Sequence, residues 1–495
     1  MLFNSIPFLI FFPVVVGIYF LLPQKAKQMW LLLASYYFYM SWNAAYALLI
    51  FGVTFLSYLG GRGIGALGGA QVPEQGKKRA WCLGICVTAV FLLLFVFKYL
   101  DFAMGSIDRI LKTAGIRLEW SGVSLLLPVG ISFYTFQAVG YLVDVYRRET
   151  KAEKSFLRYA LFVSFFPQLV AGPIERSGNL LKQLETPKPF DYDMAKKGLL
   201  LMLWGFFEKI WIADQAAILV NTVYEQYESY SAGMIAFATI LFGIQIYCDF
   251  GGYSHIAVGA AQVLGIRLMD NFRQPYFAES VREFWRRWHI SLSGWFRDYL
   301  YIPLGGSRRG KTTTYRNLMI TFLVSGLWHG ASWNYVFWGA LHGAYQIAGG
   351  VTKPFRERMG EKISLEKNHP VCRFFRILVT FLFCDFAWLF FRAPRLGYGI
   401  SMIRHGLGNL FHPYLNRNIF SLGLEGMQLL ELLLAILVLL AVDVLHERGY
   451  RLREQVENLP VVCRWSGYLL ILTCFVLFLI QNYGRAAASF IYFQF

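Results

Sequence analysis

Two histidines are the residues of this sequence best suited to do chemistry, and the first is His329. It ends an apolar segment, because from Asn317 to Gly330 no residue other than His329 can carry a charge. Along a helix the distance from Asn317 to His329 is roughly 18 Å, at about 1.5 Å per residue. A bilayer core is about 30 Å thick, so His329 is predicted near mid-depth, where an ionisable group is a functional candidate by default.

The chemistry open to His329 is proton transfer. Away from water the neutral imidazole is favoured, because desolvation penalises a charged side chain. A neutral imidazole can act as a general base and take the proton of a hydroxyl as that hydroxyl attacks a carbonyl. The alternative is a core histidine that is hydrogen-bonded to a neighbouring helix. The adjacent Trp328 and Gly330 favour the functional interpretation, since glycine lets a backbone or a ligand approach closely.

The second histidine, His289, lies in a basic and aromatic block that begins at Arg282, REFWRRWHISLSGWFRDYLYIPLGGSRRG. At helical period the block has two faces. One face carries Trp285, Trp288, Leu292, Trp295 and Tyr299, and the other carries Arg282, Arg286, His289, Ser293 and Arg297. We expect His289 to orient an acceptor or the first histidine, with Arg286, Arg287 and Arg297 neutralising phosphates nearby. The alternative is an interfacial histidine among arginines that contact lipid headgroups.

Asp249 is a third candidate, because an aspartate between apolar runs needs a partner. It is followed by two glycines in IYCDFGGYSHIAVG, and it either supports a broken helix end or takes a direct part in the chemistry. Asp385 has the same ambiguity. Trp328 and Asn334, beside His329, complete the candidate substrate-binding set. His255 and His342 are better explained as packing or interfacial residues.

The composition excludes an ordinary soluble protein. The chain has 495 residues, 56% of them hydrophobic and 16% charged, with a mean hydropathy of +0.45. Apolar runs recur along the whole length, which predicts a polytopic α-helical membrane protein. The formal net charge of +17 favours positive-inside topology and attraction to anionic lipid or ligand phosphates, so no nucleic-acid partner is expected. Cys82 and Cys86 share a helix face but have no second pair, so no metal site is expected.

The apolar segments predict about 11–13 transmembrane helices, several of them too short to cross alone. One segment, Phe156–Val170, ends in Pro167, and another, Gly233–Tyr247, runs into Asp249 and two glycines. Segments broken by glycine and proline at membrane depth are tolerated only where they line a cavity or are packed in protein. We therefore expect re-entrant or broken helices around a central site.

Basic clusters orient the chain in the membrane. Lysines and arginines recur at alternate ends of successive apolar segments, at 25–27, 62–79 and 147–154. Placing all three clusters in the cytoplasm puts Met1 outside. The basic residues from Arg286 to Arg316 put that loop on the cytoplasmic side as well. The first apolar run, Ser5–Leu22, has no basic residue before it and no cleavage site after it, so we expect a retained helix and not a signal peptide.

Several known catalytic signatures are missing. The sequence has no P-loop, no HExxH pattern and no convincing dinucleotide-binding glycine fingerprint. It has no GxSxG nucleophile elbow either. An ATPase or a covalent serine enzyme is therefore unsupported. A transporter or flippase stays open as a different class, because Asp249 and Asp385 would suit it, although the inverted repeat that it predicts is not evident.

The motifs around these residues resemble one known family, the membrane-bound O-acyltransferases. The similarity is carried by MLFNSIPFLIFF at the N-terminus, FFPQLVAGPIER at 165–176, YCDFGGYSHIAVG at 247–259, the block at 271–308, SGLWHGASWNYVFWG at 325–339 and FAWLFFRA at 386–393. It is strongest to the bacterial branch that includes the alginate O-acetyltransferases and the D-alanyl transferases of teichoic acids. The chain length suits the alginate type better.

The resemblance implies a ring of transmembrane helices around a thin, funnelled centre. It implies one acyltransferase domain over 1–495, with core motifs in 120–395 and less distinctive helices in 396–495. It also implies that His329 is the catalytic histidine and that His289 is the second family histidine. One departure is His255, where the family pattern has an aspartate after GYS, so no role is assigned to that position.

The implied reaction moves an acyl group from a cytoplasmic thioester to a hydroxyl on the outer side of a bacterial plasma membrane. Acetyl is the first candidate for this acyl group. Acetyl-CoA is the expected donor, an acyl carrier protein is the second choice, and no bound cofactor is expected. The expected acceptor is a polysaccharide or a serine of an exported partner of the SGNH-hydrolase type. Membrane lipid is a further expected contact. The alternative within the family is D-alanyl transfer to teichoic acid from a carrier protein.

Overall fold

The computed structural model describes residues 1–67, 73–116, 120–123, 128–170, 172–362, 369–410, 415–481 and 490–491. Helices make up nearly all of the regular structure in these ranges, and the β structure there is one isolated bridge between Tyr230 and Asn416. The predicted all-α fold is therefore confirmed.

The helices follow one another along the whole chain. Those of the first half are α1 (Ile6–Leu21), α2 (Gln24–Met40), α3 (Tyr46–Ala66), α4 (Pro73–Leu94), α5 (Leu100–Thr113), α6 (Ile131–Arg147), α7 (Phe156–Ser164), α8 (Phe166–Leu169), α9 (Ser177–Glu185), α10 (Tyr192–Phe206), α11 (Asp214–Glu225) and α12 (Ala232–Val263). Those of the second half are α13 (Val281–Arg287), α14 (Ile290–Phe296), α15 (Lys311–His329), α16 (Trp333–Val351), α17 (Lys353–Lys362), α18 (Pro370–Arg392), α19 (Leu396–Gly408), α20 (Gly426–Glu447), α21 (Leu452–Glu457) and α22 (Val461–Gln481). Short π- or 3-10-helical segments lie between some of them: η1 (Phe95–Tyr99), η2 (Phe207–Ala213), η3 (Tyr227–Ser229), η4 (Pro275–Phe277), η5 (Arg297–Tyr301) and η6 (Ile419–Ser421).

Six helical segments in the described ranges are long and apolar enough to cross a membrane. They are Tyr46–Ala66, Gln75–Thr113, Ala232–Val263, Pro370–Arg392, Gly426–Glu447 and Val461–Phe478, and Ile6–Leu21 is a shorter apolar helix. The chain is thus a multi-pass membrane protein. The predicted total of about 11–13 spans also counted shorter or less apolar segments, and it stays a prediction.

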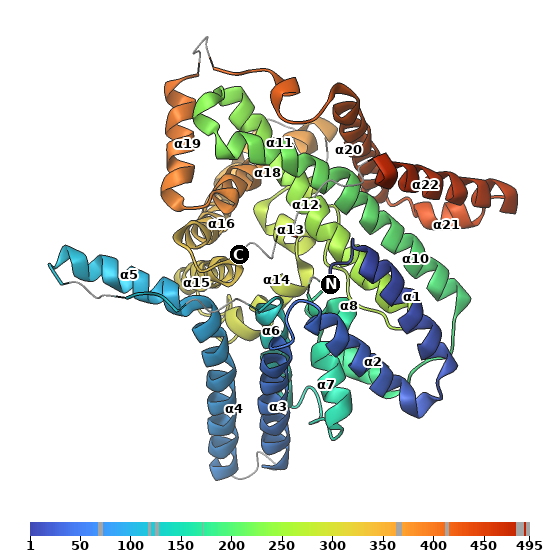
Figure 1. The fold of residues 1–495 in the computed structure, drawn as a ribbon. Coiled ribbons are helices and arrows are strands. Elements are labelled where there is room, and N and C mark those ends of the chain that lie inside the picture. Colours follow the sequence, from blue (N-terminus) through green and yellow to red (C-terminus); the bar gives the residue numbers. More distant parts are fainter. Residues whose placement is uncertain are drawn as a thin grey trace.

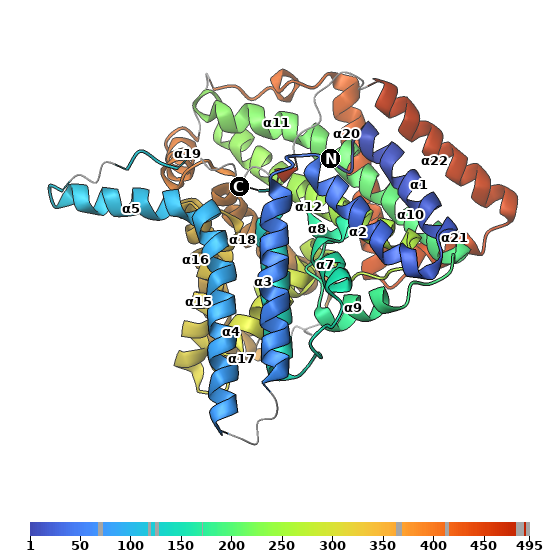
Figure 2. The same ribbon diagram turned by 60° about the horizontal axis from the view of Figure 1, so that its bottom comes forward.

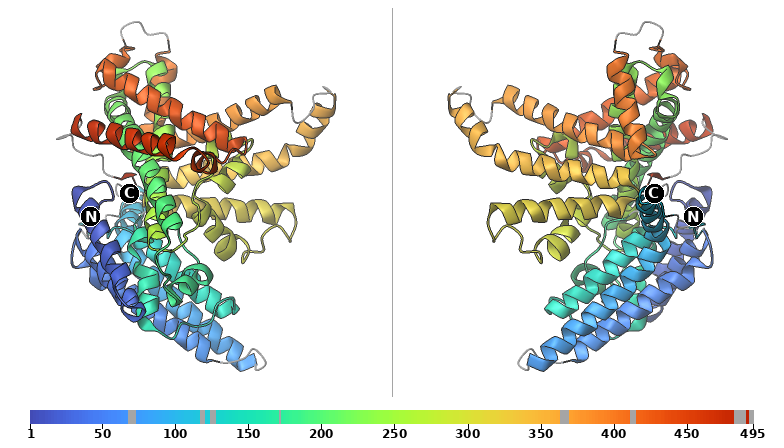
Figure 3. Two further views of the ribbon diagram at one scale, coloured as in Figure 1. Left: turned by 90° about the vertical axis from the view of Figure 1, so that its right-hand side faces the viewer. Right: turned by 90° about the vertical axis from the view of Figure 1, so that its left-hand side faces the viewer.

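The helices α12, α13 and α14 lie in the middle of the molecule, with other helices around them (Figure 1). α3 and α4 run side by side, and α5 turns sharply away from the end of α4, so the apolar stretch Gln75–Thr113 is not one straight helix (Figure 2). The helices α15 to α18 form a group that projects to one side of the rest, drawn in yellow and orange in Figure 3.

The long helix α12 corrects one expectation. The sequence predicted a break at the end of Gly233–Tyr247, but α12 is unbroken there. The glycines instead allow two helices to touch, since a Cβ on Gly252 would lie 2.6 Å from the carbonyl oxygen of Gly205 in α10. Gly259 and Gly198 meet in the same way, at 2.5 Å. These glycines therefore serve the close approach of α10 and α12.

The predicted interruption near Pro167 is confirmed. α7 ends at Ser164 and α8 begins at Phe166, with the non-helical Phe165 between them. The backbone N–H of Phe166 donates to Ser35 Oγ in α2 at 3.1 Å, so one donor released by the interruption is satisfied by a side chain of another helix.

The helices α15 and α16 form an antiparallel pair, and their contact positions the end of α15. A Cβ on Gly326 would lie 2.2 Å from the carbonyl oxygen of Tyr335. A Cβ on Gly339 would lie 2.2 Å from the carbonyl oxygen of Phe322. Glycine at both positions therefore lets the two backbones touch.

We expect Gly326→Ala to push α15 away from α16 and to lower the free energy of unfolding by about 1–3 kcal/mol, as overpacking does. The matched control is Gly349→Ala in α16, because an added Cβ there would meet nothing within 4 Å. Alanine favours a helix over glycine by about 1 kcal/mol, so the control should be neutral or stabilising. Thermal unfolding of the purified variants in detergent measures the difference, and equal midpoints would rule out the packing argument.

Candidate active site

His289 lies at a break between two helices. α13 ends at Arg287 and α14 begins at Ile290, and His289 between them has a left-handed backbone with φ of 43° and ψ of 55°. The backbone oxygen of Asn271 accepts from Ile290 N at 2.9 Å. Its side-chain oxygen accepts from Ser291 Oγ at 2.8 Å and lies 3.1 Å from His289 Nδ1. Asn271 thus replaces hydrogen bonds that are lost at the break.

The expectation of one amphipathic helix through this block is therefore wrong. The sequence predicted two continuous faces from Arg282 to Tyr299, but the left-handed residue ends the helical period at His289. A π-helical segment then begins at Arg297. His289 is fully buried, whereas Arg286 and Arg297 are exposed, so the three side chains do not share one polar face.

His329 is the last residue of α15, and a lysine closes this helix end. Lys98, from η1, donates through Nζ to the carbonyl oxygens of Trp328 at 2.7 Å and His329 at 3.3 Å. The hydroxyl of Tyr99 donates to the carbonyl oxygen of Leu327 at 3.0 Å. The last carbonyls of a helix lack intrahelical partners and carry a partial negative charge, so the N–H donors of Lys98 and the O–H donor of Tyr99 there fix the position of His329.

The two imidazoles lie close together among aromatic rings. Their ring centroids are 6.5 Å apart. The Trp328 ring lies 5.9 Å from that of His289 and 4.9 Å from that of His329. Trp338 and Phe391 pack on His329 at 5.0 Å and 5.3 Å. His289 and His329 are only 0% and 3% exposed, so both histidines singled out by the sequence meet in one site that is sealed from bulk water.

Two cavities open at opposite ends of the helix pair α16 and α18. The first, of about 1170 Å³, is lined by 331–333 at the start of α16 and by 395–401 after the end of α18. The second, of about 740 Å³, is lined by residues between 345 and 353 at the end of α16 and between 375 and 383 in α18. His329 contacts Trp338 in α16 and Phe391 near the end of α18, so it lies between the cavities and nearer to the first.

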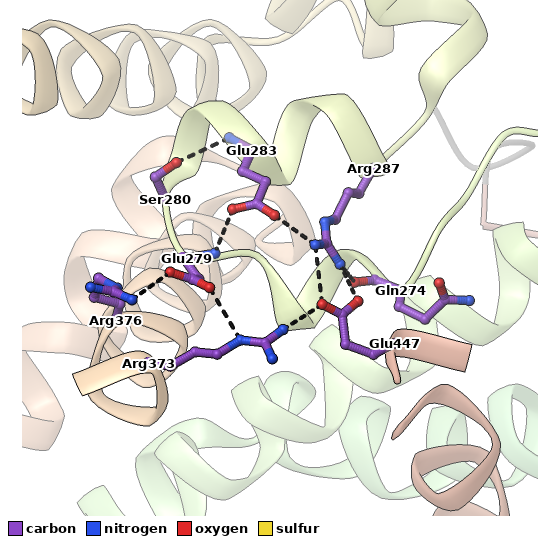
Figure 4. A network of polar contacts seen from close by, with 8 residues as sticks. All are labelled: Gln274, Glu279, Ser280, Glu283, Arg287, Arg373, Arg376 and Glu447. Atoms are coloured by element: carbon purple, nitrogen blue, oxygen red, sulfur yellow. Dashed lines mark hydrogen bonds and ion pairs between the residues drawn. The ribbon is translucent and has the colours of Figure 1, made fainter. Parts of the chain in front are cut away.

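Arg287, which was predicted to meet phosphates, is part of a charge network (Figure 4). Its guanidinium contacts Glu447 at the end of α20 and Glu283 in α13, both at 2.6 Å. Arg373 in α18 contacts Glu447 at 2.6 Å and Glu279 at 3.1 Å. The network ties α13, α18 and α20 together, and the phosphate role of Arg287 stays a prediction.

The other predicted binding residues lie in different surroundings. Arg286 and Arg297 are exposed, and Arg297 Nε contacts the neighbouring Asp298 at 2.7 Å. Asn334 is buried at the start of α16, and its Nδ2 donates to two carbonyl oxygens at the end of α18 at 3.3 Å and 2.9 Å. It therefore caps the end of α18 that carries one of the aromatic rings around the histidines. The ring of Trp328 packs against both histidines.

Asp249 lies in a buried ion cluster. Lys209 Nζ contacts Asp249 Oδ1 at 2.6 Å and Asp214 Oδ1 at 2.7 Å, and the Lys209 side chain is 1% exposed. Asp249 thus has the partner that an intramembrane carboxylate requires, and the contact supports its structural interpretation. His255, also in α12, has its Nδ1 2.6 Å from Glu208 Oε2. Within the described ranges, no three His, Cys, Asp or Glu side chains gather in a group that could hold a metal ion.

Two residues of this site were not predicted, Lys98 and Asn271. Lys98 is the only charged residue in the apolar run 81–100, so the rule that singled out His329 would also have found it. Asn271 gave no such signal, because it lies 18 residues from His289 and its contact depends on the helix break.

Paired, buried histidines between two cavities in a helical membrane protein point to the class of multi-pass membrane enzymes. The model of the membrane-bound O-acyltransferase family matches residues 147–391, which include both histidines. The chain belongs to this family and is an O-acyltransferase.

Three relatives show what the chain is similar to. A probable alginate O-acetylase, AlgI, of Pseudomonas putida is 35% identical over 100% of both chains. A peptidoglycan O-acetyltransferase of Helicobacter pylori is 35% identical over 82% of this chain and 80% of its own. A teichoic acid D-alanyltransferase of Streptococcus thermophilus is 29% identical over 44% of this chain and 56% of its own. The resemblance drawn from the motifs is confirmed, including the greater distance from the D-alanyl branch.

Proposed function

We propose that the protein transfers an acyl group from a thioester donor on the cytoplasmic side to a hydroxyl on the outer side. Acetyl is the first candidate for this group. His329 is the general base in this proposal. The observation that carries it is the position of His329, which is buried between cavities at opposite ends of α16 and α18. A donor and an acceptor that never share a compartment can meet at such a site.

In this reaction His329 takes the hydroxyl proton of the acceptor as its oxygen attacks the thioester carbonyl carbon. The carbon–sulfur bond then breaks, the carbonyl re-forms, and His329 returns the proton to the departing thiolate. The products are an ester and a free thiol. His289, held by Asn271, orients the acceptor. The aromatic wall around Trp328 keeps out water, which would otherwise hydrolyse the thioester.

The donor enters through the second cavity. Four cationic side chains line it, Arg282, Lys353, Arg356 and Arg376, and one carboxylate, Glu279, which pairs with Arg376 at 2.8 Å. Guanidinium and ammonium groups suit the phosphates of acetyl-CoA, and an acyl carrier protein is the second candidate donor. The positive-inside rule assigns this basic end and the loop before α15 to the cytoplasm, which puts the N-terminus outside.

The acceptor is proposed from the names of the relatives. One relative is named as an alginate O-acetylase and another as a peptidoglycan O-acetyltransferase, and both names state a glycan. We therefore favour a polysaccharide hydroxyl, reached directly or through the serine of an exported SGNH-hydrolase-type partner. D-alanyl transfer from a carrier protein is the second candidate, because the D-alanyltransferase matches less of the chain.

Incubation of the purified protein with radiolabelled acetyl-CoA and candidate glycans tests the proposal. The expected result is label in an alkali-labile ester on a glycan, together with release of free CoA. A parallel incubation with a D-alanyl carrier protein tests the second candidate. If folded protein moves label from neither donor to any glycan or added outer-side partner, the proposed reaction is wrong.

A further inference from the structure

The first cavity, of about 1170 Å³, has a charge pattern that acyl transfer alone does not require. Three basic side chains line it, those of Lys98, Arg109 and Arg395. Asp101 also lines the cavity, but its Oδ1 already accepts two N–H donors, at 3.1 Å and 3.0 Å. The two arginines outnumber this single carboxylate, so the lining is net positive.

The two arginines are available to a ligand. In the part of the chain that the structure describes, neither Arg109 nor Arg395 forms an ion pair, and both are exposed. Near the other end of α18, by contrast, Arg287 and Arg373 both pair with Glu447. A guanidinium without an acidic partner in the protein can bind a carboxylate through two parallel hydrogen bonds, so the first cavity offers two such sites.

The cavity also borders the segment that follows α15. Lys98 lines it and donates to the carbonyl oxygens of Trp328 and His329, at 2.7 Å and 3.3 Å. The lining residues Ala331 and Ser332 follow His329 after a single glycine. A ligand held in this cavity therefore contacts the residues that directly follow the proposed base.

We infer that this cavity is the vestibule for the acceptor and that it selects a glycan bearing carboxylates. Arg109 and Arg395 bind the carboxylates, and Lys98 is a positioning residue that holds the end of α15 where the acceptor arrives. The inference rests on the proposed function, in which the acceptor comes from this end. A polyanionic glycan fits the net positive lining, whereas a neutral glycan would leave both guanidinium groups without a partner.

The test is a binding measurement that does not depend on catalysis. Wild-type protein, the double variant Arg109→Gln/Arg395→Gln and the control Arg404→Gln are titrated in detergent with fluorescently labelled oligomannuronate. A second probe is the same oligosaccharide after its carboxylates have been reduced to alcohols. Arg404 is a suitable control because it is an exposed arginine in α19 that does not line the cavity.

We expect wild type and Arg404→Gln to bind the acidic oligosaccharide equally, and the double variant to bind it at least about tenfold more weakly. Binding by the wild type should weaken as salt is added, because the contacts are exposed charges. Equal binding of the acidic and reduced oligosaccharides by the wild type would overturn the inference. Equal binding of the acidic oligosaccharide by the wild type and the double variant would also overturn it.

His329→Ala separates this inference from the proposed function. The variant should bind the acidic oligosaccharide as the wild type does and should transfer no acetyl group. If it transfers normally, the role of His329 as base is wrong, whatever the binding shows. If the wild type transfers acetyl groups in a His329-dependent way but does not prefer acidic glycans, the vestibule inference fails and the proposed function stands.

Discussion

Replacing His329 by glutamine should lower the rate of acyl transfer by about 10²–10⁴-fold, which is the range for loss of a general base. The rings of Trp328 and Trp338 lie 4.9 Å and 5.0 Å from that of His329. Glutamine would still offer hydrogen-bonding groups among these rings, but it cannot take up a proton at neutral pH. The measurement is the initial rate of labelled acetyl transfer by purified protein that unfolds at the wild-type temperature.

His342→Gln is the matched control for this variant. His342 is also fully buried, and its Nδ1 accepts a hydrogen bond from Trp285 Nε1 at 3.2 Å. The side-chain oxygen of glutamine can accept the same hydrogen bond, so transfer should stay close to the wild-type rate. If His329→Gln transfers as fast as His342→Gln, then His329 is not the base.

The buried ion cluster predicts the largest effect on stability. Lys209→Met leaves Asp214 and Asp249 without their shared cation, although their side chains are only 12% and 3% exposed. Removing one partner of a buried ion pair costs about 3–5 kcal/mol, because the remaining charge is uncompensated. The variant should therefore unfold at a clearly lower temperature than the wild type in the same detergent.

Lys112→Met provides the comparison. Lys112 pairs with Asp108 at 2.6 Å, but its side chain is 57% exposed. An exposed pair is worth less than about 1 kcal/mol, so this variant should unfold close to the wild type. If Lys209→Met unfolds at the same temperature as Lys112→Met, the ion cluster does not hold the structure together. The alternative interpretation, in which Asp249 takes a direct part in the chemistry, would then be favoured.

The sequence predicted the fold best where a local signal decides it. An apolar run closed by glycine marked the end of α15 at His329, and Pro167 marked the interruption between α7 and α8. The prediction failed for α12, where the glycines after Asp249 suggested a break. Of these, Gly252 serves the contact with Gly205 in α10. Glycine permits both a helix break and a close helix contact, so the residue type alone does not separate the two.

The candidate site, too, was predictable only where a local signal marked a residue. Depth in an apolar segment singled out His329, and a position among arginines in a basic block singled out His289, but their approach to 6.5 Å depends on the break at His289. That break is held by Asn271, which lies 18 residues before His289 in the chain. Lys98 was visible as a charge in an apolar run, but its partner at the end of α15 is 231 residues away.

The central claim is that an acyl group passes at His329 from a donor on one side of the membrane to an acceptor on the other. The most direct test uses vesicles that contain the purified protein, with labelled acetyl donor only outside and the acceptor glycan enclosed. For molecules inserted with their cytoplasmic side outward, labelled ester should appear on the enclosed glycan, and none should appear with His329→Gln. Label found only on glycan that shares a compartment with the donor would contradict the account.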